Sequence, residues 1–345
     1  LRIELLTAGQ SAQARRELEA ALAAGDVDIV VGTQALAATD VVFRNLRLVI
    51  IDEQQRFGVS MRRMLRAKGA SADVLQLTAT PIPRTLALTL YGDVEISTIR
   101  ELPPGRQPIS TVVLRERDES VALAAVRAQL AKGRQAYIVA PSIADGQDET
   151  DGVVTLHTRL EEELAPFRVE LVHGGLPETE RSEVMAGFVD GSIAVVVATS
   201  IVEVGVSVAR ATVIVVYGAE RFGIATLHQL RGRVGRGAWA SYCYLIARGG
   251  GELAKRRLAL VASTHDGFSL SESDLQLRGP GEAFGHRQTG LPAFAAGDPI
   301  RDANIMAVAR DEAAKLVHDD DFWLLPQFAQ LRALAEDATG ELADS

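Results

Sequence analysis

The sequence predicts an α/β fold of two tandem lobes, each built on a parallel sheet, followed by a mainly helical C-terminal extension. Two observations predict it. Short apolar runs of strand length alternate with amphipathic stretches of helical length over most of the chain. Segments rich in Pro and Gly at 101–108 and 249–251 then divide the chain into three parts. We expect the first lobe at 1–106, the second at 107–248 and the extension at 249–345.

The expected elements follow from where apolar runs begin and where glycine, proline and polar residues interrupt them. In the first lobe we expect strands at 2–6, 28–32, 47–52 and 73–78, with helices near 11–24, 60–68 and 83–91. In the second lobe we expect strands near 110–115, 136–140, 168–172, 193–198, 212–217 and 242–246. The remainder predicts helices with one irregular glycine-rich stretch at 278–292.

The two lobes share a βαβ unit at an offset of 166 positions. At that offset Gly25 falls on Gly191, and the strand ending in Thr33 falls on the strand ending in Thr199. Each copy predicts a strand, a Gly turn, an amphipathic helix ended by glycine, and a second strand. An exposed threonine at a strand end can donate its hydroxyl to a phosphate, so two copies could hold one nucleic-acid strand at two points. Chance similarity between two βαβ units is the alternative.

Composition sets the broad class of the protein. The chain has 345 residues, 47% hydrophobic and 23% charged, which is typical of a soluble globular protein of about two domains. No apolar run approaches the ~20 residues that span a bilayer, and the single cysteine, Cys243, lies in an apolar run and predicts a buried, inert thiol. The six histidines do not show metal-ligand spacing. The net charge of −9 argues against a general nucleic-acid coat but allows a local basic groove.

An acidic pair follows the apolar run 48–51. Parallel sheets place ligands at the carboxyl ends of their strands, where Asp52 could hold Mg²⁺ through a nucleotide. Glu53 could orient or deprotonate an attacking water. Polar residues that merely end a strand are the alternative.

An arginine pair lies far downstream. Arg233 and Arg236 are three positions apart, so on a helix they would share a face and could offer guanidinium groups to a transferring phosphate. A surface salt-bridge pair is the alternative. We interpret the acidic pair and the arginine pair as two halves of an NTP hydrolysis site shared between the lobes.

These stretches resemble the motifs of superfamily 2 helicases and translocases, and within them the RecG family, over almost the whole chain until about residue 317. The similar stretches are 31–36 (motif Ib), 52–55 (II), 77–85 (III), 136–141 (IV), 173–175 (the element after IV), 198–206 (V) and 229–236 (VI). Residues 90–106 resemble RecG more than its relative Mfd. The stretches 275–282 and 284–290 resemble the translocation motif that RecG and Mfd share.

The resemblance implies two RecA-like P-loop NTPase lobes that use ATP and Mg²⁺. It implies the motor portion of an ATP-dependent double-stranded DNA translocase that remodels stalled replication forks and Holliday junctions. The expected partner is branched double-stranded DNA and the expected protein is a monomer without membrane attachment, in the bacterial cytoplasm at the nucleoid. A contact with single-stranded-DNA-binding protein is left open.

The resemblance also assigns roles to residues beyond the two pairs. It implies nucleotide binding or coupling for Gln55, Thr78, Thr80, Glu203, Gly205 and Gln229. It implies DNA binding for Gly32, Thr33, Arg84, His173, Gly174 and Thr199. The residues of the translocation motif are Arg278, Arg287 and Gln288. Structural alternatives are helix capping for the motif III threonines, salt bridges or loop hydrogen bonds for Arg84, Arg287 and Gln288, and a satisfied strand-end side chain for His173.

Two departures limit the resemblance. The family usually has histidine where this chain has Gln55, which hydrogen-bonds but carries no charge, so we expect altered coupling. No Gly-x-x-x-x-Gly-Lys-Ser/Thr phosphate loop occurs in the sequence, and the family's DNA-splitting wedge is also absent. We therefore expect a fragment whose first lobe is truncated and which does not hydrolyse ATP by itself. The alternatives are an Mfd-like transcription-repair coupling translocase and a non-catalytic DNA-binding module.

Overall fold

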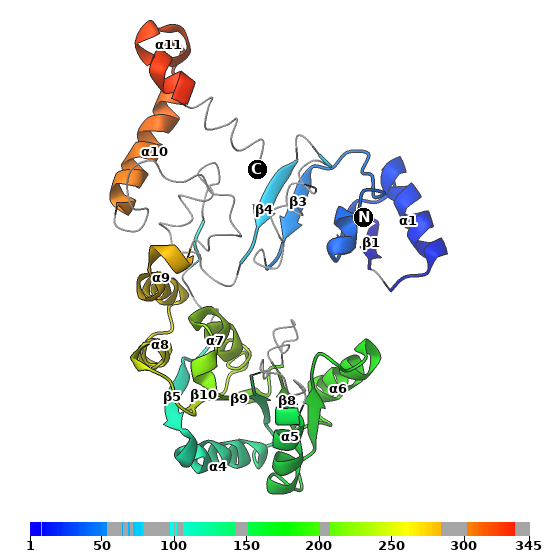
Figure 1. The fold of residues 1–345 in the computed structure, drawn as a ribbon. Coiled ribbons are helices and arrows are strands. Elements are labelled where there is room, and N and C mark those ends of the chain that lie inside the picture. The colour runs from blue at the N-terminus through cyan, green and yellow to red at the C-terminus, as the bar shows by residue number, and fades with distance from the viewer. Residues whose placement is uncertain are drawn as a thin grey trace. The chain divides into compact units, whose positions relative to one another are not determined.

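The computed structural model describes residues 1–7, 9–53, 64, 68–69, 72–78, 97–99, 101, 106–141, 151–199, 208–283 and 302–334. The chain divides into two compact units, Leu1–Ala79 and Thr80–Ser345, and each is considered by itself (Figure 1). The lobe boundaries that the sequence predicts, at 106/107 and 248/249, stay predictions.

The described residues of unit 1 form short parallel strand pairs and one long helix. Its elements are β1 (Ile3–Leu6), α1 (Ala12–Ala24), β2 (Ile29–Gly32), the 3₁₀ turn η1 (Gln34–Ala37), β3 (Leu48–Ile51) and β4 (Asp73–Gln76). Strand β1 pairs with β2 and β3 pairs with β4, both in parallel. The four predicted strands and the helix at 11–24 are confirmed to within two residues at each end. The helices expected at 60–68 and 83–91 lie almost entirely outside the described residues.

The strands of unit 1 expose an apolar face. Ile3 and Ile29 are register partners on β1 and β2, and so are Leu5 and Val31. All four side chains are exposed, Ile3 to 61% and Val31 to 56%. The small core lies on the opposite face, where α1 packs on the strands through Leu6, Leu18, Leu22 and Val41.

Unit 2 is built on one six-stranded, fully parallel sheet of order β5-β10-β9-β6-β8-β7. The strands are β5 (Ile109–Arg115), β6 (Gln135–Val139), β7 (Val169–Val172), β8 (Val195–Ala198), β9 (Ala211–Tyr217) and β10 (Ser241–Ala247). The central strands β6, β8 and β9 are buried along their whole length, which explains their continuous apolar sequences. All six predicted strands of the second lobe are confirmed.

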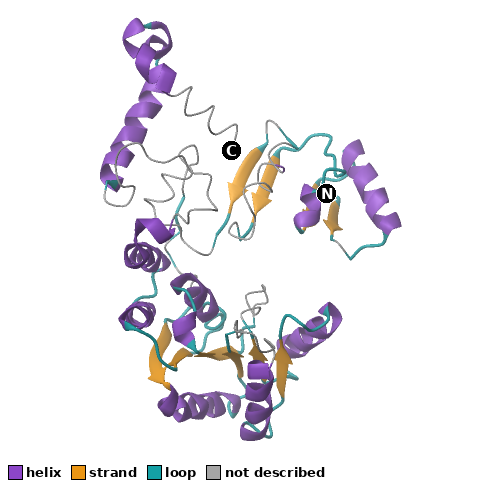
Figure 2. Ribbon diagram, viewed as in Figure 1, coloured by secondary structure: helices purple, strands orange, loops and turns teal. Residues whose placement is uncertain are grey.

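Helices cover both faces of this sheet (Figure 2). One face packs on α4 (Glu119–Leu130) and α5 (Asp151–Glu163), and the other on α6 (Glu178–Asp190) and α7 (Ile224–Arg231). The first two helices of the extension, α8 (Glu252–Ser263) and α9 (Gly267–Ala283), join the second face through Leu258, Val261 and Leu270. The α/β class with a helical extension is therefore confirmed.

The extension differs from the prediction at one point. The stretch 278–292 was expected to be irregular, but α9 continues as helix to Ala283. Leu270 and Leu275 of α9 are buried, and this packing fixes the earlier turns of the helix against weak local propensity. The rest of the stretch, 284–292, lies outside the described residues.

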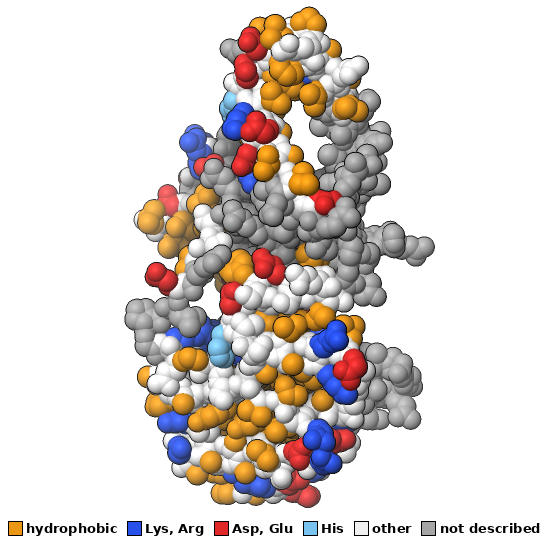
Figure 3. Space-filling view, turned by 90° about the vertical axis from the view of Figure 1, so that its left-hand side faces the viewer, with side chains coloured by type: hydrophobic (Ala, Val, Ile, Leu, Met, Phe, Trp, Pro, Cys, Tyr) orange, Lys and Arg blue, Asp and Glu red, His pale blue; other side chains and the backbone are white. Residues whose placement is uncertain are grey.

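The extension ends in α10 (Ala303–Val317), α11 (Asp320–Leu324) and the 3₁₀ turn η6 (Pro326–Phe328). Exposed hydrophobic side chains lie on these elements and on the residues after η6: Ile305, Val308, Val317, Trp323, Leu324, Leu331 and Leu334. Figure 3 shows hydrophobic side chains, in orange, at the top of the view. Among the described residues, no helix is both long and apolar enough to cross a bilayer.

The repeat predicted from the sequence is present in the backbone. Ile3 pairs with Ile29 in β1 and β2, and the residues 166 positions later, Val169 and Val195, pair in β7 and β8. The amide of Thr33 donates to the carbonyl of Leu6 at 3.3 Å, and the equivalent bond from Thr199 to Val172 is also 3.3 Å. Both units therefore contain the same strand-helix-strand unit in the same register.

The helices of the two copies are capped at their C-termini in the same way. Gly25 ends α1 with φ +80°, and Gly191 ends α6 with φ +92°, both in the left-handed region that favours glycine. In each copy an arginine donates to the last carbonyl of the helix, Arg44 to Ala24 at 2.9 Å and Arg210 to Asp190 at 2.6 Å. These arginines are again 166 positions apart, so the repeat extends further than the sequence comparison reached.

Gly191→Ala is expected to destabilise the protein more than Gly133→Ala. Both glycines have positive φ, so each alanine carries the left-handed backbone cost of about 1–2 kcal/mol. A Cβ at Gly191 would lie 2.0 Å from Nη2 of Arg210, whereas nothing lies within 4 Å of a Cβ at Gly133. Arg210 must then move and give up its bond to Asp190, which adds about 1–2 kcal/mol. Urea unfolding of the two variants measures the difference in their free energies of unfolding. Equal losses would show that the bond from Arg210 to Asp190 contributes nothing to stability.

Candidate nucleotide and nucleic-acid sites

The acidic pair lies at the carboxyl end of β3, as predicted. Val49 and Ile51 anchor the strand in the interior, Asp52 is exposed and Glu53 is half-buried. The amide of Glu53 donates to Oδ1 of Asp52 at 2.9 Å. Glu53 has φ +52°, a left-handed conformation that costs a residue other than glycine about 1–2 kcal/mol. Strain of this kind occurs mainly where function requires it, and here it turns the chain sharply after the strand.

Thr78 lies beside the acidic pair on the neighbouring strand end. The amide of Leu77 donates to the carbonyl of Ile51 at 2.8 Å, which aligns the ends of β4 and β3. The structure thus brings Asp52, Glu53 and Thr78 to one edge of unit 1. A hydroxyl and two carboxylates at one edge can hold a hydrated cation and a phosphate oxygen.

Gly32 and Thr33 lie at the end of β2. A Cβ at Gly32 would lie 2.4 Å from the carbonyl oxygen of Leu6, so the close approach of the two strands requires glycine there. Thr33 is exposed and begins η1. Its side chain is therefore accessible to a phosphate that approaches from the solvent side.

In unit 2, His173 and Thr199 lie at neighbouring strand ends, because the Thr199 amide bonds to Val172. Thr199 is only 6% exposed, so the expectation that both repeated threonines are exposed is wrong for Thr199 and right for Thr33. The difference follows from position, because β8 is flanked by β6 and β7 in a complete sheet. Nδ1 of His173 accepts from the Gly175 amide at 3.2 Å, which orders the turn that exposes Gly174.

The arginine pair does not lie on a helix. Helix α7 ends at Arg231, and Gly235 with φ +76° turns the chain between Arg233 and Arg236. The expectation of a shared helical face is therefore wrong, since the two glycines of the run end the helix.

The two arginines differ in exposure. Arg233 is 7% exposed, whereas Arg236 is exposed and its Nε donates to the carbonyl of Gly232 at 3.1 Å. Burial raises the pKa of Tyr137 to about 12, and the two guanidinium groups oppose that rise. Arg236 is therefore the member of the pair that solvent reaches, and a guanidinium group is suited to bind a phosphate.

A third arginine of this run was missed by sequence reasoning. Arg231 is 2% exposed, and its Nη1 donates to the carbonyls of Val261 at 2.6 Å and Thr264 at 2.9 Å. Its Nη2 lies 2.9 Å from Nδ1 of His228. Arg231 therefore connects α7 to the end of α8, and burial lowers its pKa. The sequence signal was its spacing of four from Leu227, which places it on the buried face of the helix.

The remaining predicted residues are placed as follows. Gln229 lies half-buried in α7, and Arg278 belongs to the backbone of α9, although its side chain is not described. Outside the described residues lie Gln55, Thr80, Arg84, Glu203, Gly205, Arg287 and Gln288. Across the described ranges, no three His, Cys, Asp or Glu side chains converge as a metal site.

The buried, inert thiol predicted at Cys243 is confirmed. The side chain lies in the sheet core on β10. Burial raises the pKa of the thiol to about 12, so little of the reactive thiolate forms near neutral pH.

Comparison with known proteins identifies similar sequences along the chain. Residues 120–238 match the helicase conserved C-terminal domain, and residues 264–337 match the C-terminal part of domain 3 of the ATP-dependent DNA helicase RecG. The ATP-dependent DNA helicase RecG of Bacillus subtilis is 45% identical over 332 residues, which cover 96% of this chain and 49% of that protein. RecG of Staphylococcus aureus strain NCTC 8325 is 45% identical over 325 residues, or 94% and 47% of the two chains. The chain thus spans about half the length of these relatives.

Solved structures agree with the sequence matches. A RecG structure bound to a three-way DNA junction is similar with a TM-score of 0.68 and 40% identity, over 89% of this chain and 40% of that one. The yeast protein Dbp5, bound to RNA and ADP BeF3, has a TM-score of 0.53 at 14% identity, over 80% of both chains. The second likeness concerns the fold alone. Together with the helicase-domain match, these structures support the predicted RecA-like lobes.

Stability is expected to fall as the pH falls from 6.5 towards 4. Burial, aided by the charge of Arg231, lowers the pKa of His228 from 6.5 to about 4. The unfolded chain therefore takes up a proton in this window while the folded chain does not, so the folded state loses stability as pH falls. Since His228 is only half-buried, we expect a loss of about 1–2 kcal/mol between pH 7 and pH 5 from this group.

Urea unfolding at the two pH values measures this loss in the unmodified protein and in His228→Gln, which should lose less. The pKa of His265 is lowered in the same direction and leaves part of the effect in the variant. His318→Gln, at the exposed end of α10, is the control. An identical loss in all three proteins would show that folding does not lower the pKa of His228.

Proposed function

This chain belongs to the RecG family, and on that premise we propose that it is the motor portion of an ATP-dependent double-stranded DNA translocase that remodels branched DNA. Its substrates are stalled replication forks and Holliday junctions. The single observation that carries the proposal is the acidic pair Asp52–Glu53, turned out from the carboxyl end of β3 by a strained backbone and aligned with Thr78.

The residues present suit ATP and Mg²⁺. Asp52 offers an exposed, hard carboxylate oxygen and is proposed to hold the metal through the nucleotide. Bound ATP supplies the γ-phosphoryl group that is transferred to water. Glu53 orients and deprotonates that water. A second set of residues binds the nucleotide or couples its state to the DNA contacts: Thr78, Gln55, Thr80, Glu203, Gly205 and Gln229. Arg233 and Arg236 neutralise the negative charge that develops on the transferred group.

DNA is proposed to be held through its phosphates. Thr33 and Gly174 are exposed at strand ends, beside the less accessible Thr199 and His173. Gly32, Arg84 and the translocation-motif residues Arg278, Arg287 and Gln288 complete the proposed contact set. Aromatic residues make up only 5% of the chain, so base stacking contributes little to the proposed DNA binding. Phosphate contacts predict weak sequence preference and steep salt dependence.

The activity is proposed for the longer protein, which acts as a monomer in the bacterial cytoplasm at the nucleoid. The sequence contains no Gly-x-x-x-x-Gly-Lys-Ser/Thr phosphate loop, whose amides and lysine cradle the phosphates in P-loop enzymes. ATP turnover therefore needs residues beyond these 345. The same observation favours a second candidate for this chain by itself, a DNA-binding module without catalysis.

The decisive experiment compares ATP hydrolysis by this chain and by a version extended upstream to the length of its relatives, each with and without forked DNA. Strong stimulation by DNA in the extended version alone supports the proposal. Salt-sensitive DNA binding without turnover in either version would favour the binding module.

Arg236→Ala in the extended protein is expected to reduce DNA-stimulated ATP turnover by about 10³-fold or more, because an arginine that stabilises transferred phosphate contributes about that much. Glu53→Gln should reduce turnover strongly as well, since the amide cannot accept the proton from water. Arg256→Ala, which removes an exposed arginine of α8, is the matched control and should change turnover little. Full turnover in Glu53→Gln would refute the assigned base, and full turnover in Arg236→Ala the assigned arginine.

A further inference from the structure

The segment that follows β2, residues 33–41, is here called the Thr33 loop. It begins at the exposed Thr33, turns through η1 and ends at Val41, which is 1% exposed in the core of unit 1. Its internal hydrogen bonds are short-range, from Leu36 to the carbonyl of Thr33 and from Val41 to that of Ala38. The loop is held to the unit at its two ends, by the bond from the Thr33 amide to the carbonyl of Leu6 and by the buried Val41. Polar side chains from other elements contact the part between them.

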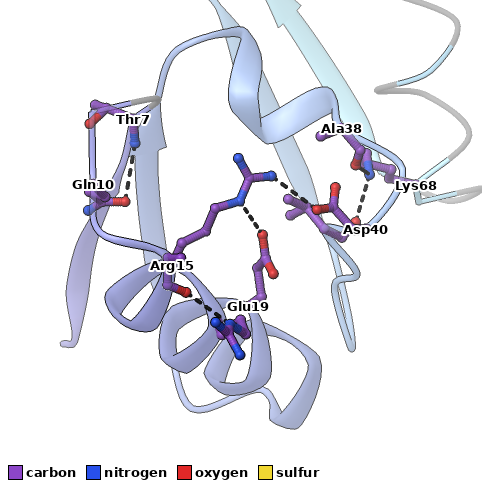
Figure 4. Close-up of polar contacts among 10 residues, drawn as sticks. Thr7, Gln10, Arg15, Glu19, Ala38, Asp40 and Lys68 are labelled. Carbon is purple, nitrogen blue, oxygen red and sulfur yellow. Dashed lines mark hydrogen bonds and ion pairs between the residues drawn. The ribbon is translucent and has the colours of Figure 1, made fainter.

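Two charged side chains hold the loop from different elements (Figure 4). Arg15 of α1 forms an ion pair with Asp40 of the loop at 3.1 Å, and its Nε bonds to Glu19 at 2.6 Å. Lys68 approaches from the connection between β3 and β4. Its ammonium group donates to the carbonyls of Ala38 and Val41, both at 2.6 Å.

The Lys68 contact consists of two hydrogen bonds from a charged donor. The lysine is partly buried, and burial lowers its pKa while the nearby charge of Asp40 opposes that change. An ammonium group removed from water interacts strongly with the carbonyl dipoles that replace its hydration. Losing Lys68 would leave two carbonyls of the loop without this partner, whereas Arg15 would still hold Asp40.

Lys68 lies between the two strands whose ends carry the proposed nucleotide-site residues. The lysine belongs to the segment that leaves β3 after Asp52 and Glu53 and returns to β4, which leads to Thr78. The start of β4 is fixed beside β3 by a bond from the amide of Asp73 to the carbonyl of Arg47 at 2.9 Å. Lys68 is thus a direct polar link between the connection that joins the two nucleotide-site strands and the loop that begins at Thr33.

We propose that Lys68 is a positioning residue that couples the β3–β4 connection to the Thr33 loop, so that the phosphate contact of Thr33 depends on this link. The inference rests on the proposed function, since it assumes that the first segment senses ATP and the second touches DNA. Lys68 itself touches neither. Arg15 links the loop to α1, and Lys68 links it to the residues that lead into β4.

The test uses the full-length protein and three variants. Lys68→Met removes the charge and the donors but keeps the length of the side chain. Lys68→Arg keeps a positive charge and at least two donors. Lys132→Met, at an exposed lysine after α4, is the matched control. The measurements are ATP turnover without DNA, the concentration of forked DNA that gives half-maximal stimulation, and the melting temperature.

We expect Lys68→Met to keep its turnover without DNA within about twofold and to need about tenfold more DNA for half-maximal stimulation, as loss of a charged hydrogen bond predicts. Lys68→Arg should recover most of the response, and Lys132→Met should match the unmodified protein. An unchanged DNA response in Lys68→Met would overturn the inference. A parallel fall in DNA-free turnover, DNA response and melting temperature would also overturn it, because it would show a purely structural lysine. Absence of DNA-stimulated turnover in the unmodified protein would instead refute the proposed function and this inference with it.

Discussion

The acidic-pair site of unit 1 and the Thr199–His173 site of unit 2 depend on the parallel pairing of short apolar strands, which brings their carboxyl ends to one edge of a sheet. The bond from Leu77 to Ile51 aligns Thr78 with the acidic pair, and the bond from Thr199 to Val172 aligns Thr199 with His173. The polar residues themselves contribute little to this alignment. It comes from the burial of residues such as Val49, Ile51 and Val172 one or a few positions earlier. A change that shifts the register by one residue would turn these side chains to the wrong face.

Cationic side chains act in three different ways in this structure. Arg44 and Arg210 donate hydrogen bonds to carbonyls at the C-terminal ends of helices, where the helix dipole favours a positive charge. Arg231 and Lys68 each bind two carbonyls across elements, and they fix one segment against another. Arg236 stays exposed beside the buried Arg233, and this is the combination that leaves positive charge available to an incoming anion.

The sequence predicted the strands well because their burial on one or both faces imposes a continuous or alternating apolar pattern. It also predicted the acidic pair and the repeat, since both follow strands. It failed where the outcome depends on contacts between distant residues. The irregular stretch expected from 278 is helical as far as Ala283, and Thr199 is buried by neighbouring strands. The carbonyl contacts of Arg231 and Lys68 were missed, since a backbone acceptor leaves no mark in the sequence; the spacing of Arg231 from Leu227 indicated only that it lies on the buried face of α7.

Strands β1 and β2 expose an apolar face to solvent. Ile3, Leu5, Ile29 and Val31 form a continuous strip on paired strands. A flat, water-facing strip of β-branched and aliphatic side chains attracts molecular chaperones and other copies of the same strip. Colloidal stability of the chain is therefore limited by the smaller unit, although the larger unit has the better-packed sheet. Replacing Leu5 or Val31, which lie inside the strands, with lysine would interrupt this strip.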